Sequence, residues 1–211
     1  MTDYISQLVQ RYGILASVEG DIRDSYEIIR KSYEAKGKLL IGGNGGSCAD
    51  SEHIVGELMK GFVKKRELEE AYKKRLEEFG GEEGKRLAAS LQGSLPAIAI
   101  TNHQALSTAF ANDVCGDMAY AQQVSGYGNE GDVLLAISTS GNALNLYYAA
   151  VTAKARGLKV IALSGKTGGR LAQIADKSII VPNNETYMIQ ELHLPIYHAF
   201  CLQLEEYFFA D

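Results

Sequence analysis

A glycine-rich loop lies near the start of the chain. Residues 42–47 read Gly-Gly-Asn-Gly-Gly-Ser, between the apolar run 38–41 and the segment Cys48 to Phe62. The run predicts a buried strand and the segment predicts a helix. A loop at such a junction directs backbone N–H groups and the positive end of the helix dipole at one point, which attracts phosphate. Because the loop matches neither a Walker A sequence nor Gly-x-Gly-x-x-Gly, it favours a phosphate monoester over a nucleotide.

A second loop, Ser138-Thr139-Ser140-Gly141-Asn142, follows the strand-like run Asp132 to Ile137. It offers three hydroxyl groups beside the start of a predicted helix. Each loop alone is also explained as a tight turn with an N-cap serine. Two such loops at the carboxyl ends of predicted parallel strands, where ligands usually bind, indicate a phosphorylated small molecule.

Four side chains could carry chemistry on this ligand. His53 and Glu57 are four residues apart, so both project from one face of the predicted helix. This spacing fits a zinc half-site, an acid/base pair or a surface salt bridge, and does not distinguish them. Gln190 and His198 lie on the predicted terminal helix, where Pro195 prevents a placement on one face from periodicity alone.

The elements that position these residues alternate along the chain. The predicted strands are 37–42, 96–101, 132–138, 158–164 and 178–182. The predicted helices are one or two within 2–36, then 48–62, 104–125, 142–156, 169–175 and 186–209. The strands are short and mostly apolar throughout, as burial on both faces requires. The pattern predicts an α/β fold with a five-stranded parallel sheet between two helical layers.

Size and charge narrow the function. The chain has 211 residues, of which 46% are hydrophobic, and a net charge of −5. These values fit a single domain, residues 1–211, and do not indicate nucleic-acid binding. No apolar stretch is long enough for a membrane helix, and the N-terminus lacks the features of a secretion signal. We therefore expect a cytoplasmic protein without nucleic-acid or membrane partners.

Residues 63–93 interrupt the alternation of strands and helices. From Lys64 to Arg86 most residues are charged, with both signs present, and Gly80-Gly81 is expected to end a helix there. We predict an exposed helical insertion. Its mixed charges favour a solvated surface over an arm that binds a partner.

Several motifs together resemble a known family. They are Gly43-Asn44-Gly45-Gly46-Ser47, His53 with Glu57-Leu58, Asn112-Asp113, the string from Gly131 through Asn142, and Gln190-Glu191-Leu192-His193 with His198. They resemble the phosphoheptose isomerases, which are sugar isomerase (SIS) domain proteins, over nearly the whole chain except the insertion. The resemblance implies a flavodoxin-like five-stranded sheet and a homotetramer with active sites between subunits. It also implies interconversion of sedoheptulose 7-phosphate and D-glycero-D-manno-heptose 7-phosphate in surface heptose synthesis.

The resemblance also implies roles for single residues. Glu57 matches the catalytic base, and His198 matches its acid/base partner. A cluster that binds zinc in some members matches His53, Glu57, Gln190 and His198. Residues expected to contact substrate are Asn44, Gly45, Gly46, Ser47, Asn112, Asp113, Ser138, Thr139, Ser140 and Gln190.

Three departures keep other readings open. Ala143 stands where the family often has serine, Tyr187 stands where many members have aspartate, and the basic residue usual soon after the glutamate is displaced to Lys60. The first alternative is an isomerase of another sugar phosphate. The second is a non-catalytic SIS-domain protein of the type that associates with a replication initiator, although Glu57 and His198 argue against it. A sugar-phosphate sensor would need a DNA-binding domain, for which the chain has no room.

Overall fold

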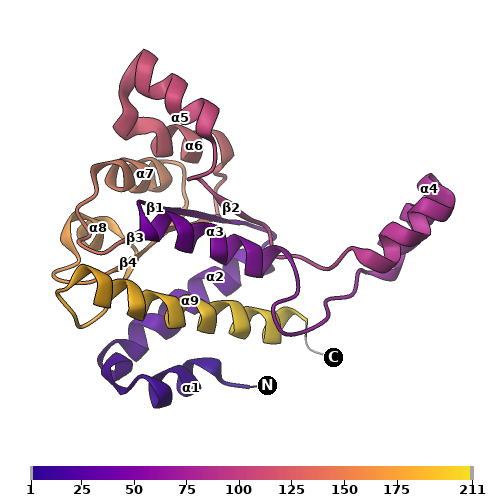
Figure 1. Ribbon diagram of the computed structural model, residues 1–211, viewed down its shortest axis with the longest axis horizontal. Helices are drawn as coiled ribbons and strands as arrows, with labels where there is room; N and C mark the ends of the chain where they lie inside the picture. Colours follow the sequence, from indigo (N-terminus) through magenta and orange to yellow (C-terminus); the bar gives the residue numbers. More distant parts are fainter. Residues whose placement is uncertain (1, 210–211) are drawn as a thin grey trace.

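Five parallel strands form the centre of the structure, a computed structural model that describes residues 2–209 (Figure 1). They are β1 (Leu39–Gly43), β2 (Ala97–Ala99), β3 (Val133–Ser138), β4 (Lys159–Ser164) and β5 (Lys177–Ile180). Their order across the sheet is β2-β1-β3-β4-β5, and each neighbouring pair is parallel. The predicted five-stranded α/β sheet is confirmed, and each predicted strand overlaps an observed one.

Helices bury both faces of this sheet. On one face, Ile41 of β1 shares a core with α1 (Tyr4–Arg11), α2 (Glu19–Glu34), α3 (Gly46–Met59) and α9 (Thr186–Phe208). On the other face, Leu40 shares a core with α6 (Ala119–Tyr127), α7 (Leu144–Ala155) and α8 (Gly169–Ile174). Because successive strand residues point to opposite faces, both sets must be apolar, which explains the continuous apolar runs in the sequence.

The helix predicted over 104–125 is not continuous, so this part of the prediction was wrong. The segment consists of α5 (Gln104–Phe110), a π-helical turn η2 (Ala111–Cys115), a 3₁₀ turn η3 (Gly116–Met118) and α6. Cys115 is extended, with φ −167° and ψ 123°. Asn112, Asp113 and Gly116 all have low helix propensity, which weakens the ladder at this point. A further 3₁₀ turn, η1 (Gly13–Val18), joins α1 to α2.

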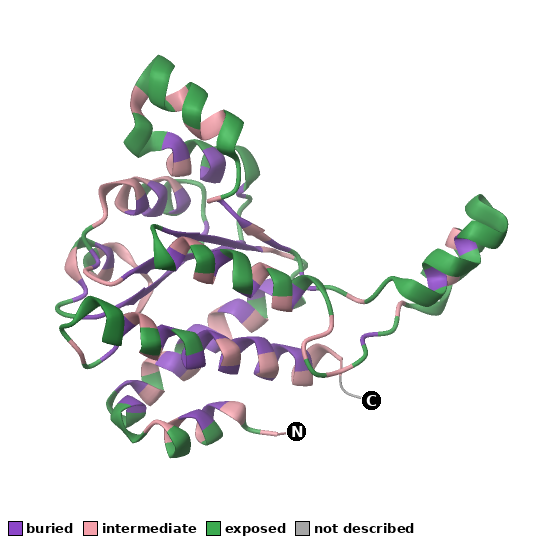
Figure 2. Ribbon diagram, viewed as in Figure 1, coloured by how far each residue is buried: buried purple, intermediate pink, exposed green. Residues whose placement is uncertain are grey.

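The charged insertion projects from the body of the molecule as α4 (Glu70–Ser90), shown at the right of Figure 1. Most of it is exposed, as predicted (Figure 2). The chain breaks helical geometry at Gly81, with φ 55° and ψ −127°, but a second helical segment then continues to Ser90. Gly81 therefore ends the first helical segment rather than the helical structure of the insertion.

The terminal helix α9 is continuous from Thr186 to Phe208 although Pro195 lies inside it. Pro195 is buried, as are the neighbouring residues Ile196 and Tyr197. Tertiary packing thus offsets the hydrogen bond that proline cannot donate. Within residues 2–209, neither α9 nor any other helix combines the length and apolar character that crossing a membrane requires.

Buried His193 on α9 gives a first prediction. Its ring is fully buried, and neither ring nitrogen has a hydrogen-bond partner. Burial lowers its pKa from 6.5 to about 4. As the pH falls, His193 therefore takes up a proton in the unfolded chain before it does so in the folded protein. Its contribution to the free energy of unfolding is complete above about pH 6.5 and is lost progressively toward about pH 4. The loss from this residue is about 3 kcal/mol at most.

Urea unfolding of wild type and His193→Leu at neutral and mildly acidic pH measures this effect. The wild type is expected to lose stability over that range, and the variant is expected to lose less. His103→Leu, at an exposed position, is the matched control and should leave the pH dependence unchanged. Equal pH dependence of wild type and His193→Leu would contradict the assignment.

Candidate active site

The two predicted phosphate loops lie side by side at the carboxyl edge of the sheet. β1 and β3 are neighbours, with Gly43 opposite Ile137, so the loops that follow them leave the sheet together. Asn44 of the first loop and Asn145 exchange two amide hydrogen bonds, both 2.9 Å long. The Tyr120 hydroxyl donates to the Gly43 carbonyl at 2.8 Å. These bonds fix the first loop to α6, which carries Tyr120, and to the start of α7, the helix that follows the second loop.

Two glycines of the first loop have different causes, which are the backbone conformation at Gly45 and the close approach of α9 at Gly46. Gly45 has a φ of 56°, a conformation that side chains rarely adopt. A Cβ on Gly46 would lie 2.4 Å from Nε2 of Gln190 on α9, so only glycine fits here. Ser47 is buried at the start of α3. Gln190 therefore lies at this loop, and its contact with substrate stays a prediction.

The spacing of residues along α3 divides it into two faces. Ser47, Ser51, Ile54 and Leu58 are buried and recur every three or four residues. Asp50, His53 and Glu57 recur on an adjacent face with the same period, and this face contacts α9. The fold thereby presents a row of ionisable side chains to the terminal helix.

Helix α9 lies along α3 and runs in the same direction. Gln190 is next to Gly46, the Tyr197 hydroxyl lies 3.1 Å from Nδ1 of His53, and Glu205 accepts from the backbone N–H of Phe62 at 2.8 Å. The residue numbers of these contacts rise together along both segments, so the two helices are parallel. Because Tyr197 and His198 face the middle of α3, an imidazole from the last helix reaches the row of ionisable groups.

His53, Glu57 and His198 come together at this contact. Nε2 of His53 lies 3.3 Å from Oε1 of Glu57, and the ring centroids of His53 and His198 are 5.0 Å apart in an edge-to-face arrangement. The Phe62 ring packs 5.5 Å from the His198 ring, measured between centroids. One chain thus brings together the carboxylate and the imidazole that the sequence analysis paired.

The surroundings of His198 favour its neutral imidazole. Its Nε2 atom is buried and has no hydrogen-bond partner. Burial and the nearby His53 lower its pKa, and the carboxylate of Glu57 only partly opposes them. A neutral imidazole can accept a proton at one nitrogen and donate one from the other, which suits proton transfer between neighbouring oxygen atoms.

A basic side chain also contacts Glu57. Nζ of Lys60 lies 3.2 Å from Oε2 of Glu57 and donates to the Gly61 carbonyl at 3.2 Å. The two carboxylate oxygens of Glu57 thus have different neighbours, His53 on one side and Lys60 on the other. The displaced basic residue noted in the sequence therefore reaches the carboxylate despite its altered position.

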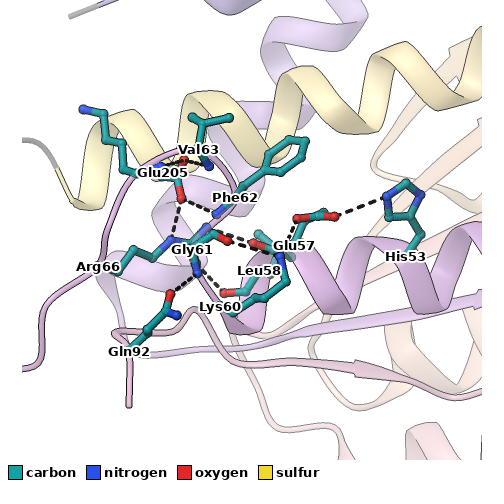
Figure 3. A network of polar contacts seen from close by, with 11 residues as sticks. His53, Glu57, Leu58, Lys60, Gly61, Phe62, Val63, Arg66, Gln92 and Glu205 are labelled. Carbon is teal, nitrogen blue, oxygen red and sulfur yellow. Dashed lines mark hydrogen bonds and ion pairs between the residues drawn. The ribbon is translucent and has the colours of Figure 1, made fainter. Parts of the chain in front are cut away.

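A buried ion pair holds the end of α3 against α9 (Figure 3). Nε of Arg66 donates to Oε1 of Glu205 at 2.8 Å, and both side chains are fully buried. The other two guanidinium nitrogens donate to the last carbonyl groups of α3, those of Leu58 at 2.7 Å and Glu57 at 2.8 Å. Arg66 thus caps the helix that carries Glu57, at carbonyls that have no partner within the helix.

Both carboxylate oxygens of Glu205 accept hydrogen bonds. Its carboxylate accepts from the backbone N–H groups of Phe62, Val63 and Lys64 at 2.8, 2.9 and 3.1 Å. Burial acts to raise the pKa of Glu205, but these N–H groups and Arg66 outweigh it, so the pKa is lowered. The turn that leaves α3 is therefore fixed to α9 by an ionised carboxylate.

The structure does not test the predicted zinc site. Within residues 2–209, no three His, Cys, Asp or Glu side chains converge closely enough to hold a metal ion. His53 and Glu57 are close, whereas Gln190 lies at the glycine-rich loop, near Gly46. Zinc at His53, Glu57, Gln190 and His198 therefore stays a prediction.

Other predicted residues lie apart from the cluster. Asn112 and Asp113 are exposed in η2 and hydrogen-bond to each other at 2.8 Å. In the part of the chain that the structure describes, no hydrogen bond or ion pair joins them to the other predicted site residues. In the second loop, Ser138 is buried, Ser140 accepts from the backbone N–H of Asn142 at 3.2 Å, and Thr139 is partly buried. Their contacts with substrate stay predictions.

Sequence reasoning missed five residues that shape this site. They are Asp50, Arg66, Tyr120, Asn145 and Tyr197. Asp50 could have been found, because it precedes His53 by three residues and Glu57 by seven on one helix face. Arg66 could not, because it stands in a run of charged residues with nothing to separate it from its exposed neighbours.

Comparisons with protein families and curated proteins show which proteins this chain resembles. The family model described as SIS domain matches residues 83–165. The phosphoheptose isomerase of Nitratiruptor is 39% identical over 171 residues, which cover 81% of this chain and 78% of the relative. The phosphoheptose isomerase of Synechocystis is 32% identical over 100% of this chain and 96% of the relative.

Solved structures give the same similarity in three dimensions. A phosphoheptose isomerase from Francisella tularensis superposes with a TM-score of 0.76 at 29% identity, covering 96% of this chain and 95% of that one. The phosphoheptose isomerase from Neisseria gonorrhoeae has a TM-score of 0.73 at 30% identity, covering 96% and 93%. The fold is therefore that of this group of structures.

The buried ion pair gives a prediction on stability. Glu205→Gln leaves Arg66 buried without a counter-charge, which costs about 3–5 kcal/mol of the free energy of unfolding. Glu82→Gln removes one partner of the exposed pair with Lys85 and should change stability by less than about 1 kcal/mol. Chemical denaturation measures both variants. A Glu205→Gln variant as stable as Glu82→Gln would show that the pair does not hold α3 and α9 together.

Proposed function

Because this chain belongs to the phosphoheptose isomerase family and is a phosphosugar isomerase, we propose that it interconverts sedoheptulose 7-phosphate and D-glycero-D-manno-heptose 7-phosphate. The relatives at 39% and 32% identity carry the name phosphoheptose isomerase. That reaction would supply heptose for bacterial surface polysaccharide.

The observation that carries the proposal is the meeting of Glu57, His53 and His198 on the α3–α9 contact. An aldose–ketose isomerisation moves a proton between C1 and C2 through an enediol. It needs a base beside the two carbon atoms and a group that moves a proton between their oxygens. A carboxylate with a neutral imidazole nearby supplies both.

In the proposed reaction, the Glu57 carboxylate removes a proton from C1 of the ketose. His198 donates a proton to the carbonyl oxygen on C2, which gives the enediol. His198 then accepts the proton of the hydroxyl on C1 as the new carbonyl forms, and Glu57 returns its proton to C2. Each group ends in its starting state, so the enzyme is ready for another turnover.

The distance between loop and base suits a long sugar. Glu57 follows Ser47 by ten residues on α3, which is about 15 Å of helix axis. A phosphate bound at the loops would therefore lie far from the carbon atoms beside Glu57. This separation favours a substrate with its phosphate and its carbonyl at opposite ends of the carbon chain.

Incubation of the purified protein with sedoheptulose 7-phosphate, followed by NMR of the anomeric protons, tests the sugar. Appearance of the signals of the aldose supports the proposal. Failure to convert this ketose, with conversion of another sugar phosphate, would favour the alternative isomerase. Ala143 keeps that alternative in view, because this N-cap of α7 makes no side-chain hydrogen bond where a serine could provide one.

Two further features stay predictions. A homotetramer, with active sites between subunits, is tested by light scattering coupled to size-exclusion chromatography. Zinc is tested by metal analysis of protein purified without added metal.

Substitution of the proposed base is the most specific kinetic prediction. Glu57→Gln preserves the shape of the side chain but removes its basicity, so kcat should fall by about 10²- to 10⁴-fold. Binding of the sugar phosphate, measured by calorimetry, should be retained. Glu52→Gln, an exposed position on the same helix, is the matched control and should keep turnover. Near-normal turnover in Glu57→Gln would remove Glu57 from the mechanism.

A further inference from the structure

The side chains of Asn44 and Asn145 form a pair of amides that joins the glycine-rich loop to the start of α7. Nδ2 of Asn44 donates to Oδ1 of Asn145, and Nδ2 of Asn145 donates to Oδ1 of Asn44, both at 2.9 Å. Oδ1 of Asn145 also accepts from the backbone N–H of Leu146 at 3.0 Å. This N–H belongs to the first turn of α7, where it has no partner within the helix.

The backbone N–H of Leu146 determines which way both amides point. It can only donate, so the Asn145 atom that faces it must be the oxygen rather than the nitrogen. The Asn44 atom that faces the same oxygen must then be its nitrogen. The orientation of the Asn44 amide therefore follows from a fixed donor on α7.

Asn145 stands on a closely packed helix, whereas Asn44 stands in a loop of glycines. Leu146, the residue after Asn145, is fully buried, and a Cβ on Gly42 would lie 3.1 Å from its Cδ2 atom. Asn44 is exposed and has a glycine on either side. Because glycine permits many backbone conformations, the loop alone does not hold the Asn44 side chain in one orientation. Asn145 therefore orients Asn44 rather than the reverse.

The pairing turns the oxygen of the Asn44 amide toward the protein and leaves one donor for a ligand. Oδ1 of Asn44 accepts from Asn145 and has the Tyr120 hydroxyl 3.5 Å away, although the Tyr120 proton makes its shorter bond, 2.8 Å, to the Gly43 carbonyl. Nδ2 of Asn44 carries two protons, and one of them bonds Asn145. Within residues 2–209, no group accepts a hydrogen bond from the other proton. Because the two N–H bonds of an amide diverge, this second N–H points away from the pair.

A donor of this kind suits a phosphate group better than a sugar hydroxyl. The oxygens of an ionised phosphate only accept hydrogen bonds, whereas a hydroxyl both donates and accepts. The loop that carries Asn44 also precedes α3, whose first backbone N–H groups and dipole favour an anion. An amide turned the other way would set its own oxygen against the phosphate and weaken binding.

We propose that Asn145 is a positioning residue that holds the Asn44 amide with its remaining N–H directed at the bound phosphate group. Asn145 itself does not contact the ligand and acts through Asn44. The inference rests on the proposed function in one respect, which is that the phosphate belongs to the sugar substrate. The orientation of Asn44 by Asn145, and the contact of Asn44 with phosphate, do not depend on which sugar is converted.

Titration with inorganic phosphate at constant ionic strength tests the contact without any turnover. In ¹⁵N-labelled protein, Asn44→Ala identifies the side-chain amide signals of Asn44, and these signals should shift as phosphate is added. Asn145→Ala should weaken phosphate binding by about 2- to 10-fold, because binding must then order the Asn44 side chain. Asn129→Ala, at an exposed position before β3 and therefore at the opposite edge of the sheet, is the matched control and should bind phosphate as the wild type does.

A double-mutant cycle shows whether Asn145 acts through Asn44. In an Asn44→Ala background, Asn145→Ala should have no further effect on phosphate affinity, since no amide is left to hold. Backbone amide signals of the loop report binding in these variants. A residue that merely stabilises the fold would lower the affinity by the same factor in both backgrounds. Alanine is also a good helix former, so Asn145→Ala should leave α7 intact.

Kinetics with sedoheptulose 7-phosphate provide a second readout. Asn145→Ala should raise KM by a similar factor with little change in kcat, because the phosphate contacts are the same in the substrate and in the transition state. Asn44 signals that do not respond to phosphate, wild-type phosphate affinity in Asn145→Ala, or equal effects in both backgrounds would overturn the inference. If the phosphate results hold but the sugar phosphate is not converted, the proposed function fails and the role of Asn145 stands.

Discussion

The side-by-side contact of α3 and α9 is the constraint on which the site depends. The two helices come from distant parts of the chain and run in the same direction on one face of the sheet. A buried carboxylate, Glu205, fixes one end of this contact through Arg66 and the turn after α3. The fit of Gln190 against Gly46 fixes the other end, at the glycine-rich loop. Between these points lie the groups that can exchange protons.

The sheet and its helical layers could be predicted from the sequence because their causes are local. The inner strands are buried on both faces and must be apolar, as Val133 to Ile137 show. The break between α5 and α6 was missed, because the low helix propensity of Asn112, Asp113 and Gly116 is a weak signal inside an otherwise helical pattern. The second helical segment after Gly81 was missed for a related reason. Glycine indicates that a helix stops but not whether another begins.

The site could be predicted only in part. Glu57 and His53 share a helix face, which spacing alone reveals, and the pairing with His198 came from resemblance to a family. Tyr197 and Arg66 were not predictable, because their roles depend on how α9 lies on α3. Pro195 also made the facing of α9 uncertain from periodicity, and only packing shows that the helix continues through it. Contacts between distant segments are thus the part of a site that is hardest to predict from the sequence.

Incorporation of solvent deuterium into the sugar tests the central claim most directly. If Glu57 moves a proton through an enediol beside His198, conversion in D₂O should place deuterium on C2 of the aldose product, because the proton on a solvent-accessible base exchanges with water. Mass spectrometry and NMR of the product measure both the amount and the position of the label. Conversion without any label at C2, under conditions where the carboxylate exchanges faster than turnover, would contradict proton transfer by this pair.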